Sequence, residues 1–240
     1  MYTIIFAAIL PAILLVIYIY LRDRHQREPL SQIVRGVFYG VISAGIAYVL
    51  ESMLQLFGCL IPQPFTFLQA AWNAFIGAAI PEEMSKLLML WLLLRNNRYF
   101  DERFDGIVYA VCVGMGFAGT ENILYLVSNI NDWQEMAIGR AMFAVPGHFL
   151  FAVTMGYFYS KIYFGDMSWR KKSRIFWAPV LFHGIYDSIL FMIDMNTILS
   201  NILLIGFYAF CFGLFRYGRN RIREQIHRDE NDPNQIAYYK

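Results

Sequence analysis

The chain has 240 residues, of which 58% are hydrophobic and only 16% are charged. An ordinary soluble domain has about 45–50% apolar residues, so this chain has too few polar residues to cover a water-soluble fold of its size. Its formal net charge of +2 is too small to indicate a nucleic-acid-binding protein. The composition therefore predicts a polytopic membrane protein that folds as one compact unit.

Seven apolar segments are long enough to cross a bilayer, for which about 20 helical residues suffice. We expect them at residues 2–21, 36–57, 66–94, 106–130, 136–163, 175–194 and 197–215. The third and fifth segments are longer than one crossing requires, and Pro81 and Pro146 are candidate breaks within them. The sequence thus predicts an all-α transmembrane helix bundle of about seven spans at residues 1–215. A basic and polar cytoplasmic tail, partly disordered, is expected at 216–240.

Basic residues alternate between the loops. Arginine and lysine follow the first, third, fifth and seventh segments, whereas the loops GCLIPQP and NDWQE contain neither. Because cytoplasmic loops carry an excess of these residues, we predict that the N-terminus lies outside and the C-terminus inside. The first segment lacks a basic start and is followed by RDRHQR, so we expect a retained helix rather than a signal peptide.

Ionisable side chains inside these segments are few, and each costs at least about 2.5–3.5 kcal/mol at the membrane centre. Glu51 and Arg140 lie near segment ends, so we expect their side chains to reach back toward the membrane surface. The others lie deeper, at overlapping depths on four helices: Glu82, Glu83, Lys86, Glu121, His148, His183 and Asp187. This distribution predicts a shared polar site, although a buried ion-pair network that only holds helices together would give the same pattern.

Within two of these helices, the spacing places polar side chains on one face. Lys86 follows Glu82 by four residues and Glu83 by three, so it can pair with either acid. Asp187 follows His183 by four residues, which would let its carboxylate orient a ring nitrogen of the histidine. The spacing therefore predicts one ion-paired cluster and one His–Asp pair.

Proline and glycine residues accompany the buried acids. Pro81 favours the first turn of a helix, so we expect the following glutamates to open a half-helix inside the membrane, with free N–H groups at its start. Gly114, Gly116 and Gly119 precede Glu121 and predict close approach of neighbouring helices.

Carboxylates together with two histidines favour activation of a water molecule over a covalent nucleophile. The chain has no GxSxG serine motif, no HExxH zinc motif and no paired aspartates of the YD and GxGD type. We therefore predict hydrolysis by a glutamate-activated water, either without a metal or on zinc. A zinc site would use Glu82, Glu121, His148 and His183 if they converge.

Three short motifs resemble those of a known family. EEMSK at 82–86, FAGTEN at 117–122 and HGIYD at 183–187 are similar to the EExxK, FxxxE and HxxxD motifs of the PrsW family. These bacterial membrane proteases resemble the wider group of type II CAAX prenyl proteases and bacteriocin-processing enzymes. The motifs occur in order on successive helices, and the resemblance covers about residues 1–215.

This resemblance implies a multi-pass endopeptidase of the bacterial plasma membrane. Its expected role is the site-1 cut of a single-span anti-sigma factor in regulated intramembrane proteolysis, which frees a stress sigma factor. By resemblance, Glu82 and Glu83 carry the catalytic carboxylate, with Glu82 favoured as the base, and His183 holds the water or the oxyanion with help from Asp187. Glu121 stands where the CAAX proteases have a histidine. Those relatives are described as metal-free glutamate enzymes, so no cofactor is favoured and zinc is the alternative.

Two other functions fit the buried charges. A proton-coupled transporter also places Glu, His and Lys residues inside the membrane, although this sequence shows no inverted repeat. A non-enzymatic membrane scaffold would keep the helices and lose the second glutamate or the HxxxD pair, and both are present.

Overall fold

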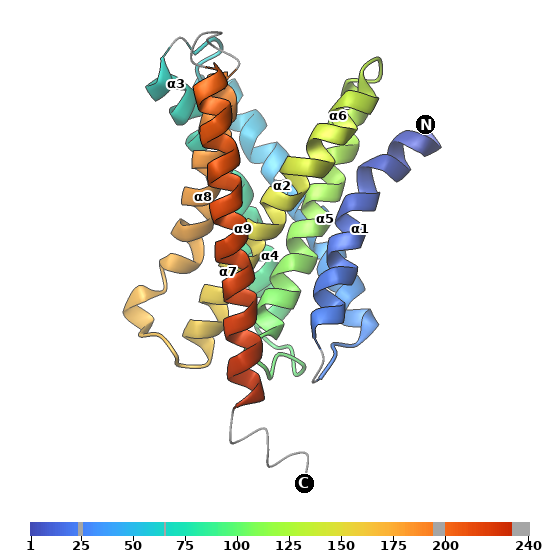
Figure 1. The fold of residues 1–240 in the computed structure, drawn as a ribbon, viewed down its shortest axis with the longest axis vertical. Helices are drawn as coiled ribbons and strands as arrows, with labels where there is room; N and C mark the ends of the chain where they lie inside the picture. The colour runs from blue at the N-terminus through green and yellow to red at the C-terminus, as the bar shows by residue number, and fades with distance from the viewer. Residues whose placement is uncertain (24–25, 65, 194–199, 232–240) are drawn as a thin grey trace.

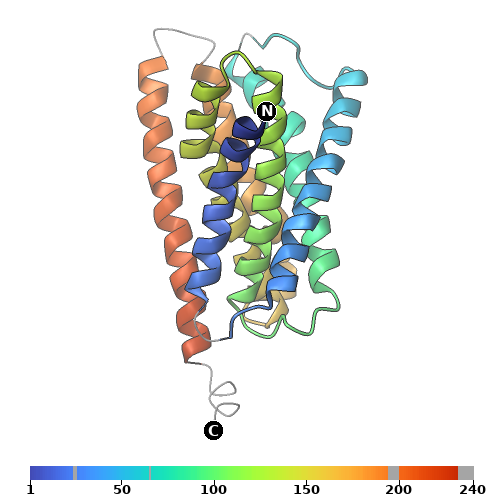
Figure 2. The same ribbon diagram turned by 90° about the vertical axis from the view of Figure 1, so that its right-hand side faces the viewer.

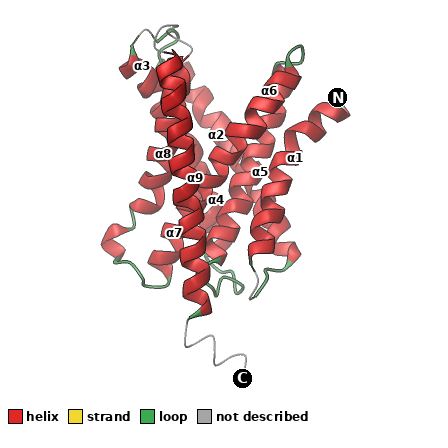
Figure 3. Cartoon of the chain, viewed as in Figure 1, coloured by secondary structure: helices red, strands yellow, loops and turns green. Residues whose placement is uncertain are grey.

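The computed structural model describes residues 1–23, 26–64, 66–193 and 200–231. These residues form helices and no strand (Figure 3). The α-helices are α1 (Tyr2–Arg22), α2 (Leu30–Leu56), α3 (Phe67–Trp72), α4 (Ile80–Leu94), α5 (Asp105–Ser128), α6 (Trp133–Gly139), α7 (Val145–Tyr163), α8 (Arg174–Ile193) and α9 (Ser200–Glu230). The π-helices η1 (Asn73–Ala79) and η2 (Arg140–Ala144) and the 3-10 helix η3 (Trp169–Lys171) complete the set.

Helices long and apolar enough to cross a membrane account for most of the chain. In the described part, six stretches qualify: Tyr2–Arg22, Leu30–Leu56, Asp105–Ser128, Trp133–Tyr163, Trp169–Ile193 and Ser200–Glu230. The other predicted span, 66–94, consists of α3, η1 and α4, which follow one another without interruption from residue 67. The helices run side by side along the long axis of the molecule (Figure 1). The predicted all-α membrane bundle is confirmed.

The last helix is longer than the sequence indicates. The predicted boundary after residue 215 falls inside α9, which continues to Glu230. Buried Ile222 and Asp229 attach this extension to the bundle, because the Asp229 carboxylate accepts hydrogen bonds from the backbone N–H groups of Arg103 (3.0 Å) and Phe104 (2.8 Å). Residues 216–230 therefore belong to the helical bundle, whereas the rest of the expected tail, from residue 232, lies outside the described residues.

Both candidate breaks in the long segments are π-helical turns. η1 ends directly before α4, of which Pro81 is the second residue, and η2 stands in the same position before Pro146 of α7. The N–H group of Ile80 bonds to the carbonyl of Phe75, five residues earlier, so the chain stays helical. The predicted half-helix with free N–H groups is wrong, because a wider π-turn accommodates the proline instead.

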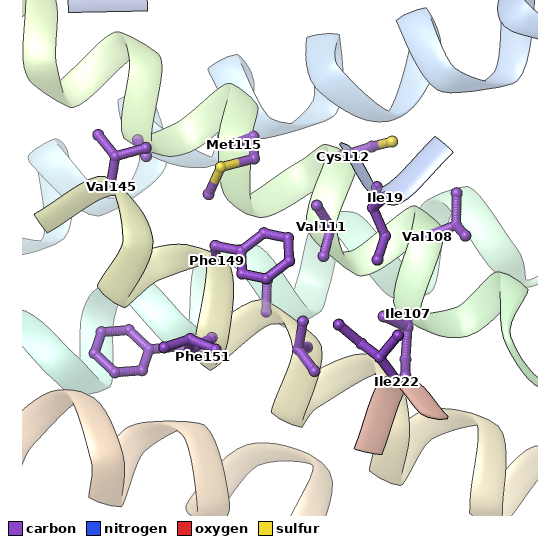
Figure 4. Packing of buried hydrophobic residues seen from close by; sticks show 14 of the residues in the cluster. Ile19, Ile107, Val108, Val111, Cys112, Met115, Val145, Phe149, Phe151 and Ile222 are labelled. Atoms are coloured by element: carbon purple, nitrogen blue, oxygen red, sulfur yellow. The ribbon is translucent and has the colours of Figure 1, made fainter. Parts of the chain in front are cut away.

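Helix α5 lies at the centre of the bundle (Figure 2). In its apolar stretch 78% of the residues are buried, against 22% in α1 and 17% in α9. Figure 4 shows Val111 and Met115 of α5 packed near Phe149 of α7, with Ile19 of α1 close by. Since lipid is as apolar as these side chains, tight packing between the helices, rather than escape from water, stabilises this core.

Glycines let α5 approach its neighbours closely. A Cβ atom on Gly116 would lie 2.0 Å from the carbonyl oxygen of Val37 in α2, and one on Gly114 would lie 2.7 Å from the Cβ atom of Ala152 in α7. No larger residue fits either position without moving a helix. The predicted close approach around Glu121 is confirmed at these two contacts, and it brings α2 and α7 to the helix that carries this glutamate.

Candidate active site

The deep ionisable side chains of four helices meet in one cluster. Helix α4 contributes Glu82, Glu83 and Lys86, and α5 contributes Glu121. Helix α7 contributes His148, and α8 contributes His183 and Asp187. Among these, Glu83 is fully buried, and the lysine and both histidines are at most 5% exposed. The overlapping depths on the four helices therefore correspond to direct contact in space.

The ammonium group of Lys86 lies at the centre of this cluster. Its Nζ atom is 3.1 Å from Glu82 Oε2, 2.8 Å from Glu83 Oε1 and 3.1 Å from His148 Nδ1. A lysine has three donors, and each of them finds an acceptor here. The ring centroid of Phe117 lies 3.9 Å from the same nitrogen, which adds a cation–π contact. Lys86 thus pairs with both acids, as their spacing predicts.

These contacts fix the proton on His148. Because an ammonium group only donates, Nδ1 of His148 must accept the hydrogen bond from Lys86. The other ring nitrogen, Nε2, lies 2.8 Å from Glu121 Oε2 and must then carry the hydrogen that it donates. His148 is therefore a neutral imidazole that links Lys86 to Glu121.

His183 has carboxylates on both sides of its ring. Its Nδ1 atom lies 2.9 Å from Glu83 Oε1, and its Nε2 atom lies 3.2 Å from Asp187 Oδ2. Both nitrogens can donate to ionised carboxylates only when the ring is a charged imidazolium. Phe151 stacks on the ring with centroids 4.7 Å apart and fixes its plane. His183 is thus held as a proton donor beside Glu82, whose Oε2 atom is 3.9 Å from Nε2.

The two adjacent glutamates have different surroundings. Glu82 lines a cavity of about 520 Å³ and a second one of about 150 Å³. Glu83 lines neither of these cavities, and its Oε2 atom is buried without a hydrogen-bond partner. Each space is larger than the roughly 30 Å³ that a water molecule occupies. Of the two acids, Glu82 is therefore the one beside space that water and substrate can enter.

Arg140 belongs to the cluster, although the sequence did not indicate it. Its Nη2 atom is 2.6 Å from Glu121 Oε2 and its Nε atom is 2.6 Å from Asn122 Oδ1. We expected this side chain to reach back toward the membrane surface; in the structure it instead binds the half-buried carboxylate of Glu121. A signal was present: Arg140, Ala144 and His148 are four residues apart on one helix face, and all three line the smaller cavity.

Helix α2 forms one wall of the larger cavity. Ala44, Ala47, Tyr48 and Glu51 lie on the same face at helical spacing and line this space together with Glu82. Small side chains at the first two positions leave the room that the cavity occupies. Glu51 therefore faces the same cavity as the candidate catalytic acid, which its place near the end of a span did not indicate.

A group of potential metal ligands lies within this site. Donor atoms within 4.8 Å of one another come from Glu82, Glu83, His148 and His183. Glu83 replaces Glu121 of the predicted zinc set, because Glu121 contacts the outer nitrogen of His148 and Arg140. Carboxylate and imidazole suit zinc, but Lys86 already binds both acids and His148 at 2.8–3.1 Å. A divalent cation among the same atoms would be repelled by this ammonium, so the residues as arranged do not fit a resident metal.

Comparison with known proteins agrees with the motifs. Residues 28–214 match the family described as PrsW family intramembrane metalloprotease. The chain belongs to the PrsW family. It is similar to three relatives named Protease PrsW, from Geobacillus kaustophilus, Bacillus subtilis and Clostridioides difficile, with identities of 36% over 194 residues, 35% over 211 and 33% over 187. These alignments cover 79%, 84% and 76% of this chain and 80%, 86% and 77% of the relatives.

No solved structure matches the chain. The PrsW relatives are bacterial, and the bundle has several helices that can cross a bilayer. The protein is therefore a multi-pass protein of the bacterial plasma membrane, a member of a family of intramembrane proteases that act on protein substrates.

Proposed function

We propose that this PrsW protein is the site-1 protease of a single-span anti-sigma factor and that it cleaves without a metal, by a water that Glu82 activates. The observation that carries the chemistry is the different placing of the two glutamates. Glu82 lines both cavities of the site, whereas Glu83 is enclosed by Lys86 and His183. The substrate class rests on the resemblance of the three motifs to those of the family.

In this mechanism the Glu82 carboxylate takes a proton from a water molecule. The water oxygen then forms a bond to the carbonyl carbon of the substrate, and the carbonyl oxygen becomes an oxyanion. The imidazolium of His183, 3.9 Å from Glu82, stabilises that charge. The proton held by Glu82 passes to the amide nitrogen as the C–N bond breaks, which releases a carboxylic acid and an amine.

The remaining residues of the cluster hold these two groups in place. Lys86 offsets the charge of both glutamates. Glu83 and Asp187 keep His183 charged. His148 bonds both Lys86 and Glu121 and so fixes the position of one relative to the other. The family description names a metalloprotease. In the arrangement proposed here the cation beside the carboxylates is the lysine, and each step uses only groups of this chain and water.

The position of the larger cavity fits an extracytoplasmic cut. Its lining includes Leu60 in the loop after α2 and Asn129 directly after α5. In Figure 1, α3, which follows that loop, and α6, which follows α5, lie at the end of the bundle away from the C-terminus. With the predicted C-inside orientation, this end faces outward, and a substrate segment would enter from that side.

Co-expression with a candidate single-span anti-sigma factor tests the proposal. Glu82→Gln, Glu83→Gln and His183→Ala should each abolish release of the clipped fragment. Glu135→Gln is the matched control, because this exposed glutamate of α6 lies outside the cluster and should leave cleavage unchanged. Each variant should accumulate in the membrane at the level of the parent chain. Continued release of the fragment by all three site variants would contradict the proposal.

A further inference from the structure

The wall of the larger cavity has an unbalanced charge. Among the described residues, its lining contains three glutamates, Glu51, Glu82 and Glu121, and no lysine, arginine or histidine. Two of the three are neutralised from behind the wall, since Glu82 pairs with Lys86 and Glu121 pairs with Arg140. The surface that a ligand meets is therefore acidic, although the cations of the site lie nearby.

Glu51 is the glutamate without a partner. Its carboxylate makes no hydrogen bond and no ion pair with any other described residue, whereas Glu82 has Lys86 at 3.1 Å and Glu121 has Arg140 at 2.6 Å. An uncompensated acid within a membrane span is costly, so such residues commonly serve a ligand path. Here the carboxylate borders a cavity of about 520 Å³ that also contains the proposed base, a volume usual for a ligand-binding site.

We infer that Glu51 is a specificity residue that binds a lysine or arginine side chain of the substrate next to the bond to be cleaved. The inference rests on the proposed protease function and adds the chemistry of one substrate position. Among the described residues that line this cavity, Glu51 is the acid that a cationic side chain would find unpaired, and it is half-buried, so an ion pair there is stronger than at a fully exposed surface. A neutral or acidic side chain would leave that carboxylate unpaired or repelled.

Binding of defined peptides tests the inference without requiring turnover. The full chain carrying Glu82→Gln is purified in detergent and titrated with three fluorescent 12-residue apolar peptides that differ only in a central Lys, Gln or Glu. The lysine peptide should bind roughly tenfold or more tightly than the glutamine peptide, as about 1.4 kcal/mol of ion pairing gives. Addition of Glu51→Gln should reduce this ratio to about one, and Glu51→Lys should favour the glutamate peptide.

Glu51→Gln is expected to fold, because it changes one atom of a side chain that has no partner. Glu135→Gln in the same background is the control and should keep the full lysine preference. Equal affinity for the lysine and glutamine peptides, an unchanged preference in Glu51→Gln, or no binding of any peptide would overturn the inference. Cleavage of the same peptides by the chain with Glu82 intact separates the two claims. Lysine-selective binding without cleavage contradicts only the protease function, and cleavage without lysine preference contradicts only the role of Glu51.

Discussion

Two networks of charged side chains in this PrsW protein differ in burial and in charge balance. The network around Lys86 lies between α4, α5, α7 and α8, and its lysine and both α4 acids are at most 6% exposed. The other joins α7 to α9: Lys161 and Arg221 bind Glu224 at 3.1 and 2.7 Å, with side chains 11%, 32% and 27% exposed. Water reaches the second network and is excluded from most of the first.

This difference in burial and charge balance indicates a functional site around Lys86 and a structural attachment of α9 to α7 around Glu224. Around Glu224 the cations outnumber the carboxylate, and the side chains are partly exposed, as in surface ion pairs that hold two helices together. Around Lys86 the acids outnumber the lysine, and removal of any one charge leaves another uncompensated in a region of low dielectric constant. A cluster that is so costly to assemble is expected to be kept for chemistry, whereas the α7–α9 network is expected to serve attachment.

The largest contrast should appear when one acid of each network loses its charge. Glu82→Gln should lower kcat/KM by about a hundredfold or more, the usual contribution of a general base. Glu224→Gln should leave kcat/KM within about twofold, because its helix pair lies away from the cavities. Cleavage of a reporter substrate by purified variants gives both values. A similar loss in both variants would show that charge in general, and not Glu82, supports activity.

Replacing the lysine of each network, Lys86 or Lys161, should lower the free energy of unfolding by different amounts. Lys86→Met removes the ammonium group that bonds Glu82, Glu83 and His148 and should cost roughly 3–5 kcal/mol, because buried acids are left unpaired. Lys161→Met should cost about 0.2–1 kcal/mol, as expected for a partly hydrated pair. Thermal unfolding in detergent measures both. An unchanged Tm for Lys86→Met would mean that the acids are not held by this lysine.

Arg140 provides a test of positioning. Arg140→Lys keeps the charge but cannot reach both Glu121 and Asn122 with a planar group. Activity should fall roughly ten- to a hundredfold, because Glu121, and through it His148, loses its fixed place. KM should change less than kcat, since Arg140 is assigned no contact with substrate. A loss confined to KM would instead assign this arginine to substrate binding.

The smallest effect should be a response to salt. The α7–α9 network is partly exposed, so raising the ionic strength should reduce the stability difference between the parent chain and Lys161→Met. The difference between the parent chain and Lys86→Met should be unaffected, because that lysine is buried. Unfolding midpoints at low and high salt measure this comparison. Equal salt sensitivity would mean that water enters the Lys86 cluster.

Sequence alone predicts what depends on spacing within one helix. The contacts of Lys86 with Glu82 and Glu83, and of His183 with Asp187, follow from separations of three and four residues. Depth in the membrane also predicts that α4, α5, α7 and α8 contribute to one polar region, because charged side chains inside a membrane pair with one another.

Side-chain direction across helices could not be predicted in the same way. The four-residue spacing places Arg140 on the same helix face as His148, but it does not show which residue of another helix Arg140 contacts; that partner is Glu121. The helix through Pro81 also continues where an interruption was expected, because the π-turn η1, closed by the bond from the N–H of Ile80 to the carbonyl of Phe75, leads directly into α4. Glu51 was assigned by its distance from a helix end, whereas packing of α2 on α5 turns it to the cavity.

Metal dependence distinguishes Lys86 from a metal ion as the cation beside the carboxylates of the proposed active site. The purified chain is stripped with a chelator, its zinc content is measured by mass spectrometry, and its cleavage of a reporter substrate is followed before and after zinc is added. We predict that stripped protein with less than about one zinc per ten chains retains full activity and that added zinc does not increase it. Loss of activity on stripping, with recovery on addition of zinc, would show that the enzyme needs a metal and contradict catalysis with Lys86 as the cation.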